Sequence, residues 1–288
     1  MFAQLGRIAA IAVCSLLLVA AVLGALPAGS TLNALPDAPT TWAGRTRELV
    51  VVAGTFNYGN STIARTPVLS AVASAAVRSV AVIAGTAFVL TLVSVVLGSL
   101  AAMRSHSRFV QLALKIVNAI SAMPVLVWST LIFVISARSM GWILREDAFL
   151  ARAIVAAIIS LTIGDRILGD LTRRVELAVR EVAVEPYMRT VRAADLGYRR
   201  HMLLSLVKPI GTAIISRSMF LIGGAIVAEQ VFEIHGLGFL VVKALNGQEQ
   251  EPHLILAASL ALVAIGLAFR ILYTAVLALA DPRSRVTV

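Results

Sequence analysis

The sequence predicts an all-α membrane protein with about six transmembrane helices, each needing about 20 apolar residues to cross a bilayer. The chain is 59% hydrophobic and only 14% charged, whereas soluble domains carry about 25% charged residues. Its mean hydropathy is +0.91. Polar segments separate several apolar runs that are long enough to span a membrane.

Each predicted span rests on one such run. The first, preceded by Arg7, is longer than the apolar core of a signal peptide, which has about 7–15 residues, so we interpret it as a membrane helix. Pro124 lies inside the third run and should kink that helix, because proline removes a backbone donor. Asp165 and Arg166 interrupt the end of the fourth run. The candidate spans cover residues 8–26, 77–103, 110–135, 151–168, 210–228 and 254–280.

These spans divide the chain into three parts. We predict a first transmembrane helix over residues 1–27, an extracytoplasmic loop over residues 28–75, and a core of five further helices over residues 76–288. A long polar loop at about residues 170–208 lies within the core. Lys and Arg are densest near both termini and in this loop, so the positive-inside rule places all three in the cytoplasm.

Composition and motifs argue against several function classes. The net charge is +10, but the basic residues lie between apolar spans and form no aromatic-interleaved face of the kind that binds nucleic acid. Cys14 is the only cysteine, and the four histidines show no ligand spacing, so we expect no disulfide and no metal site. The chain has no Walker A loop, H-E-x-x-H or G-x-S-x-G motif, and we therefore expect no catalytic residues.

The segment 185–200 is polar and charge-rich in an otherwise apolar chain. Pro186 suits the first turn of a helix, the residues from Tyr187 to Ala194 favour a helix, and Gly197 is typical of a stop before a second helix that leads to Pro209. Two interpretations are open: a structured element that contacts a soluble partner, or a solvated loop with a routine basic bias.

Three arginines fall in or near predicted spans: Arg166, Arg217 and Arg270. Each costs about 2.5–3.5 kcal/mol at a helix centre on insertion scales, so it should face the bundle interior or reach an interface. We favour the interface for Arg166, and both interpretations stand for Arg217. The candidate translocation path consists of Arg217, Pro124 and Glu229.

Several motifs resemble those of a known family. Tyr187-Met-Arg-Thr-Val-Arg-Ala-Ala-Asp-Leu196 resembles the cytoplasmic coupling loop, or EAA loop, of permease subunits of binding-protein-dependent ABC importers, most closely those of the dipeptide, oligopeptide and nickel group. Glu229-Gln-Val-Phe-Glu-Ile-His-Gly-Leu-Gly238 is similar to the family's turn after the fifth helix. The family's ending resembles Ala280-Asp-Pro-Arg-Ser-Arg285, and Asn57-Tyr-Gly-Asn-Ser61 is similar to the segment before its second helix. Asp195 stands where the family has a loop glycine, which is a departure.

The resemblance implies a type I ABC importer permease fold and a heteromeric machine in the bacterial cytoplasmic (inner) membrane. Its implied partners are a second permease, two ATP-binding cassette subunits and an extracytoplasmic binding protein. ATP and Mg would bind to the ATPase subunits, and this chain would bind no cofactor. The substrate class would be peptides or similar small polar solutes. The implied ATPase-coupling residues are Glu185, Tyr187, Arg189, Thr190, Arg192, Ala193, Ala194, Asp195, Leu196 and Gly197.

Within this segment we expect Arg189 and Arg192 to pair with acidic residues of an ATPase groove, while Val191, Ala193 and Ala194 allow close packing. The alternative function is a self-contained, ion-coupled secondary transporter that uses Asp165 or the arginines at positions 166, 217 and 270. Such transporters often have inverted repeats and discontinuous helices, and neither feature is evident in the sequence.

Overall fold

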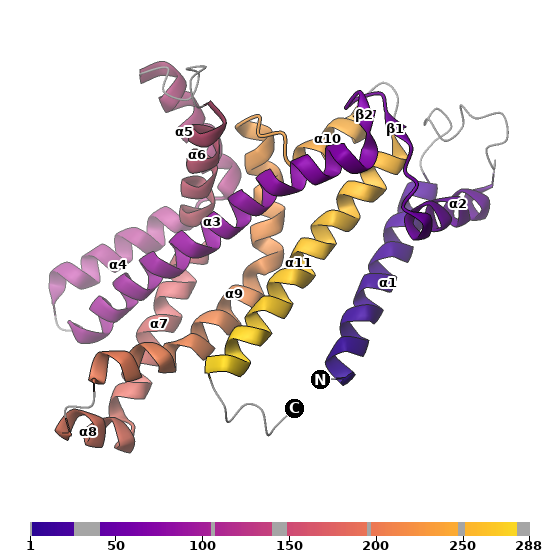
Figure 1. Cartoon of the computed structure of the whole chain (residues 1–288). Coiled ribbons are helices and arrows are strands. Elements are labelled where there is room, and N and C mark those ends of the chain that lie inside the picture. The colour runs from indigo at the N-terminus through magenta and orange to yellow at the C-terminus, as the bar shows by residue number, and fades with distance from the viewer. Residues whose placement is uncertain are drawn as a thin grey trace. The chain divides into compact units, whose positions relative to one another are not determined.

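The computed structural model describes residues 2–25, 41–104, 107–139, 149–194, 197–246 and 251–280, and these residues are almost entirely helical (Figure 1). The chain forms two compact units. The first unit comprises Met1–Ala81 and Glu233–Ala268, and the second comprises Val82–Phe232 and Phe269–Val288. Two long helices, α3 (Val68–Met103) and α11 (Pro252–Ala280), belong partly to each unit.

In the first unit, α1 (Phe2–Gly24) packs against α2 (Trp42–Thr55). The N-terminus of α2 is capped by Thr41, whose hydroxyl accepts from the Gly44 N–H at 3.2 Å, a bond that satisfies one free donor of the first turn. The Trp42 indole donates to the Ala21 carbonyl at 3.0 Å and thereby joins the two helices.

The segment predicted as a loop over residues 28–75 contains more regular structure than expected. It holds α2, a short antiparallel hairpin of β1 (Asn60–Ser61) and β2 (Thr66–Pro67), and the start of α3 at Val68. The start of α3 at Val68 precedes the predicted span, which begins at residue 77, and the intervening residues are apolar apart from Ser70 and Ser74. Their hydroxyls donate back to the Pro67 and Ala71 carbonyls at 2.8 and 2.9 Å, which is compatible with a helix.

The second unit is organised around two long helices that lie side by side, α7 (Ile167–Val184) and α9 (Tyr198–Val231). The sequence analysis treated residues 170–208 as a polar loop that contains a short helix and a second helix. α8 (Pro186–Ala193) and the start of α9 match those two helices, whereas α7, which occupies the first part of this segment, was not predicted. One face of α7 is apolar and packs against α9, and that packing stabilises the helix despite its many charges. The buried residues of this core are Val175, Ala178, Val179, Leu206 and Ile210.

Pro209, the point at which the second helix was expected to reach the membrane, lies inside α9. The helix continues through the proline because Leu206 and Ile210 are buried against α7 on both sides of it. Packing of this kind can offset the loss of a single backbone hydrogen bond.

The predicted kink at Pro124 is confirmed, and it is a complete break. The helices α4 (Arg108–Ser121) and α5 (Val125–Ser139) meet there at an angle of 92°. A second break separates α6 (Phe149–Ile163) from α7 at Asp165 and Arg166, which both have positive φ values.

The two breaks are joined by hydrogen bonds. The Asp165 N–H donates to the Met123 carbonyl at 3.0 Å, and the Arg166 N–H donates to the Ser121 carbonyl at 2.5 Å. The Asp165 carboxylate accepts from the Val125 N–H at 3.0 Å. These bonds satisfy backbone groups that the breaks would otherwise leave unpaired.

The described residues confirm an all-α membrane protein. Three helices are long and apolar enough to cross a bilayer: α3, α9 over His201–Val231, and α11 over Pro252–Val276. The bent α4–α5 pair meets the same criteria when taken together, which gives up to four spans. Within the described part of the chain, α1 from Ala10, α6 and α10 (Leu237–Asn246) are shorter apolar helices. The count of six spans remains a prediction.

Candidate coupling site

Local sequence defines the limits of α8. Pro186 disfavours a helical conformation in the residue before it, and Glu185 accordingly has φ −59° and ψ 136° and ends α7. Pro186 then occupies the first turn of α8, where its missing N–H costs nothing. Gly197 has φ 66°, a left-handed conformation that glycine adopts without strain, and α9 begins after it. The predicted order of short helix, turn and second helix is confirmed.

The residues of α8 form two distinct faces. Met188 and Val191 are 1% and 8% exposed, and their three-residue spacing puts both on the inner face. The sequence analysis expected Val191 to pack against a partner, and this is wrong, because Val191 is buried within its own chain. The outer surface carries most of the predicted coupling residues, namely Glu185, Tyr187, Arg189, Thr190, Arg192, Ala193 and Ala194.

A side-chain hydrogen bond fixes α8 to α9. The Tyr187 hydroxyl lies 2.9 Å from Ser205 Oγ, and Ser205 in turn donates to the His201 carbonyl at 2.9 Å. Because α8 also contacts α7, it is held by both helices. Tyr187 is therefore both exposed and hydrogen-bonded to α9.

Gly197, the last residue of the predicted site, is exposed beyond the end of α8. Asp195 and Leu196 lie outside the described residues, as do residues 281–285 of the C-terminal motif.

The charges of α7 include one that the sequence analysis missed. Glu176 is buried, and its carboxylate pairs with Arg180 at 2.6 Å and with Arg173 at 3.3 Å. The spacing of three and four residues along a helix was the available signal. These pairs offset the charges of Arg173 and Arg180 on α7, whereas Arg189 is exposed on α8.

Of the three residues predicted for a translocation path, two lie on α9 and one lies between α4 and α5. Arg217 on α9 forms an ion pair with Asp170 on α7, and its guanidinium lies 5.4 Å from the centre of the Phe220 ring. Arg217 therefore contacts a neighbouring helix, and its place in a translocation path stays a prediction. Pro124 lies at the α4–α5 break, and Glu229 is 1% exposed near the end of α9. Asp170 was missed because its partner is distant in sequence.

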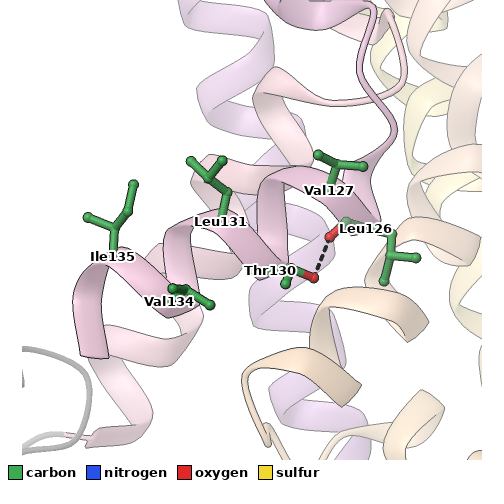
Figure 2. A pocket seen from close by; sticks show the side chains of 6 residues that line it. All are labelled: Leu126, Val127, Thr130, Leu131, Val134 and Ile135. Carbon is green, nitrogen blue, oxygen red and sulfur yellow. Dashed lines mark hydrogen bonds between the residues drawn. The ribbon is translucent and has the colours of Figure 1, made fainter. Parts of the chain in front are cut away.

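A pocket of about 610 Å³ lies along α5 and is lined by Leu126, Val127, Thr130, Leu131, Val134 and Ile135. Figure 2 shows these side chains on successive turns of the same helix. The only polar side chain, Thr130, donates to the Leu126 carbonyl at 2.8 Å. This surface offers apolar contact to lipid or to another helix, and it has no group that could perform chemistry. The residues described contain no group of three or more side chains that could hold a metal ion.

Comparison with known proteins gives two findings. A family model described as "Binding-protein-dependent transport system inner membrane component" matches residues 94–286. The chain is also similar to the glutathione transport system permease protein GsiC of Escherichia coli (strain K12), Shigella flexneri serotype 5b and Shigella dysenteriae serotype 1. The identity is 33% over 124 residues, which are 41% of this chain. The match spans 40% of the length of these curated relatives.

Proposed function

This chain belongs to the family of inner membrane components of binding-protein-dependent transport systems, and from that premise we propose that it is the permease subunit of an ATP-driven importer. The observation that carries this proposal is α8, a helix with an exposed basic surface and a buried inner face anchored on α7 and α9. Such a helix is suited to receive force from a soluble partner.

The proposed machine contains a second homologous permease, two ATP-binding cassette subunits and an extracytoplasmic binding protein. In this arrangement the ATPases bind ATP and Mg, and α8 and both termini of this chain are cytoplasmic. The proposed substrates are peptides or similar small polar solutes, which agrees with the transport of glutathione named for the relatives.

In the proposed mechanism, closure of the ATPase dimer displaces α8 and thereby changes the membrane helices between two arrangements. Arg189 and Arg192 pair with acidic residues of the ATPase groove, while Ala193 and Ala194 allow its surface to approach closely. Tyr187 transmits the displacement to α9 through Ser205. Because α9 is one helix of 34 residues, movement at its cytoplasmic end reaches the membrane interior.

We expect Ala194→Arg to abolish co-purification of the ATPase subunits with this chain. Ala194 is exposed at the C-cap of α8, so a large side chain should leave the fold intact but block close approach of a partner. The measurement is the amount of ATPase recovered when the complex is purified through a tag on this chain.

Ala194→Ser is the matched control, because it changes the same position with little change in volume and should retain the ATPases. Unchanged complex formation and transport in Ala194→Arg would argue against α8 as the coupling element.

An ion-coupled secondary transporter is the second candidate. The structure has discontinuous helices at α4–α5 and α6–α7, a feature of such transporters, where the sequence indicated only a kink at Pro124 and an interrupted span at Asp165. The Asp170–Arg217 pair adds a charged group between helices. Proteoliposomes that contain only this chain distinguish the two functions, because ion-driven uptake without an ATPase would support the transporter, whereas uptake that requires ATPase subunits would support the importer.

A further inference from the structure

A second pocket, of about 330 Å³, lies entirely within the first unit. We name it the α3–α10 pocket, because its main walls are the first turns of α3 and the N-terminal part of α10. The remaining wall is the turn between β1 and β2, including Ile63. None of the predicted coupling or path residues lines it.

The lining of the α3–α10 pocket is basic. Arg78 on α3 and Lys243 on α10 both contribute to it, and the described residues that line it include no acidic side chain. The Lys243 ammonium lies 5.7 Å from the centre of the Phe239 ring, and the His235 ring lies against the same ring at a tilt of 48°, with centroids 4.6 Å apart. Arg78 and Lys243 should attract an anionic group, because no carboxylate among the described lining residues neutralises them.

Hydrogen bonds hold the two helical walls together. Arg78 donates to the His235 carbonyl at 2.9 Å. A guanidinium has five N–H donors in one plane, so the remaining N–H groups of Arg78 can donate to a ligand. The Leu237 N–H donates to Ser79 Oγ at 2.8 Å. The cationic group of Arg78 is thereby held in position before any ligand arrives, which lowers the entropic cost of binding.

The third wall is held by a buried carboxylate. Glu251 accepts from Ser61 Oγ at 2.6 Å, from the Thr62 N–H at 2.8 Å, from the Thr62 hydroxyl, and from the Ile63 N–H at 3.0 Å. These donors satisfy the negative charge of Glu251 locally. The Glu251 carboxylate therefore stabilises the turn and does not neutralise the two cations that line the pocket.

We propose that the α3–α10 pocket binds a carboxylate group. A planar guanidinium suits the two oxygens of a carboxylate, and Lys243 supplies a second charge. The carboxylate comes from a solute or from an acidic side chain of a partner protein. His235 follows α9, whose residues His201–Val231 are long and apolar enough to cross a bilayer. With α8 in the cytoplasm, the chain at residue 235 would therefore emerge on the other side of the membrane. That this side is extracytoplasmic rests on the proposed function.

The test uses the full-length chain in phosphatidylcholine nanodiscs, with sodium glutarate as the probe and saturation-transfer difference NMR as the readout. We expect glutarate to bind and the neutral glutaramide to give no signal. Lys243→Gln should weaken glutarate binding about tenfold, as expected for the loss of one charge-assisted contact. Arg78→Gln should have a similar effect. Lys115→Gln removes an exposed charge from α4 and should bind glutarate like the unmodified chain.

Equal binding of glutarate and glutaramide would overturn the proposal, as would unchanged glutarate binding by Lys243→Gln in a folded chain. A second probe, the end-blocked tripeptide acetyl-Gly-Glu-Gly-amide, distinguishes the sources of the carboxylate. Tighter binding of the tripeptide indicates an acidic side chain of a partner, and tighter binding of glutarate indicates a solute. These measurements need no ATPase, so their failure is distinct from a failure of the coupling experiment.

Discussion

Glu251→Ala is expected to release the turn between β1 and β2 and raise the hydrogen-exchange rate of the Ile63 amide about 100-fold, equivalent to about 3 kcal/mol. The substitution removes the acceptor of four hydrogen bonds at once. Ser61 is buried, so its hydroxyl loses a partner where water has little access, and such unsatisfied groups are costly. Hydrogen–deuterium exchange mass spectrometry of peptides covering residues 58–67 measures the effect.

Glu181→Ala is the control, because Glu181 is an exposed acid on α7 in the second unit. It should leave exchange in residues 58–67 unchanged. If Glu251→Ala also left this exchange unchanged, the carboxylate would not be what holds the turn.

The same site predicts a pH dependence. Burial alone would raise the pKa of Glu251, but hydrogen bonds from Ser61, Thr62 and Ile63 more than offset it, and the pKa lies below its ordinary value of 4.5. A carboxyl group with a lowered pKa stabilises the folded state above its unfolded pKa, and this contribution is lost as the pH falls through the folded pKa. Protection of the Ile63 amide, corrected for intrinsic exchange, should therefore decrease below about pH 4.5. Glu251→Gln should lack this dependence.

Gly98→Ala is expected to destabilise the second unit by about 1–3 kcal/mol, the usual cost of overpacking. A Cβ at this position of α3 would lie 2.7 Å from the Thr172 carbonyl oxygen and 2.7 Å from the Val175 Cβ, both on α7. A backbone carbonyl cannot rotate away as a flexible side chain can, so α3 and α7 would have to separate. The measurement is the midpoint of thermal unfolding of the purified chain in detergent.

Gly223→Ala provides a matched control on α9. A Cβ there meets no atom within 4 Å, and alanine has a higher helix propensity than glycine by about 1 kcal/mol. Gly223→Ala should therefore leave the unfolding midpoint unchanged or raise it. Equal effects of the two substitutions would contradict the close approach of α3 and α7.

Motifs and composition predicted much of this protein correctly. The apolar runs indicated a helical membrane protein, Pro186 and Gly197 predicted the two ends of the α8 segment, and the residues around Arg189 identified the family. Pro124 predicted a kink, although the angle of the break depends on contacts that are distant in sequence. Local conformational preferences act over a few neighbouring residues, and for that reason they can be predicted from one amino-acid sequence.

Other features depend on residues that meet only after folding. The helical structure of α7 could not be inferred from hydropathy, because its charges obscure an apolar face that packs on α9. Glu251 and Ser61 are separated by 190 positions, and Asp170 and Arg217 by 47, so no periodicity links them.

The amino-acid sequence by itself determined the membrane class, the family and the local shape of α8, because propensity, proline and glycine act on neighbouring residues. Only the tertiary structure decided which face of α8 is outward, which carboxylate holds the turn between β1 and β2, and that Arg78 and Lys243 line one pocket. Burial and electrostatic pairing depend on distances in space, and the folded chain sets those distances.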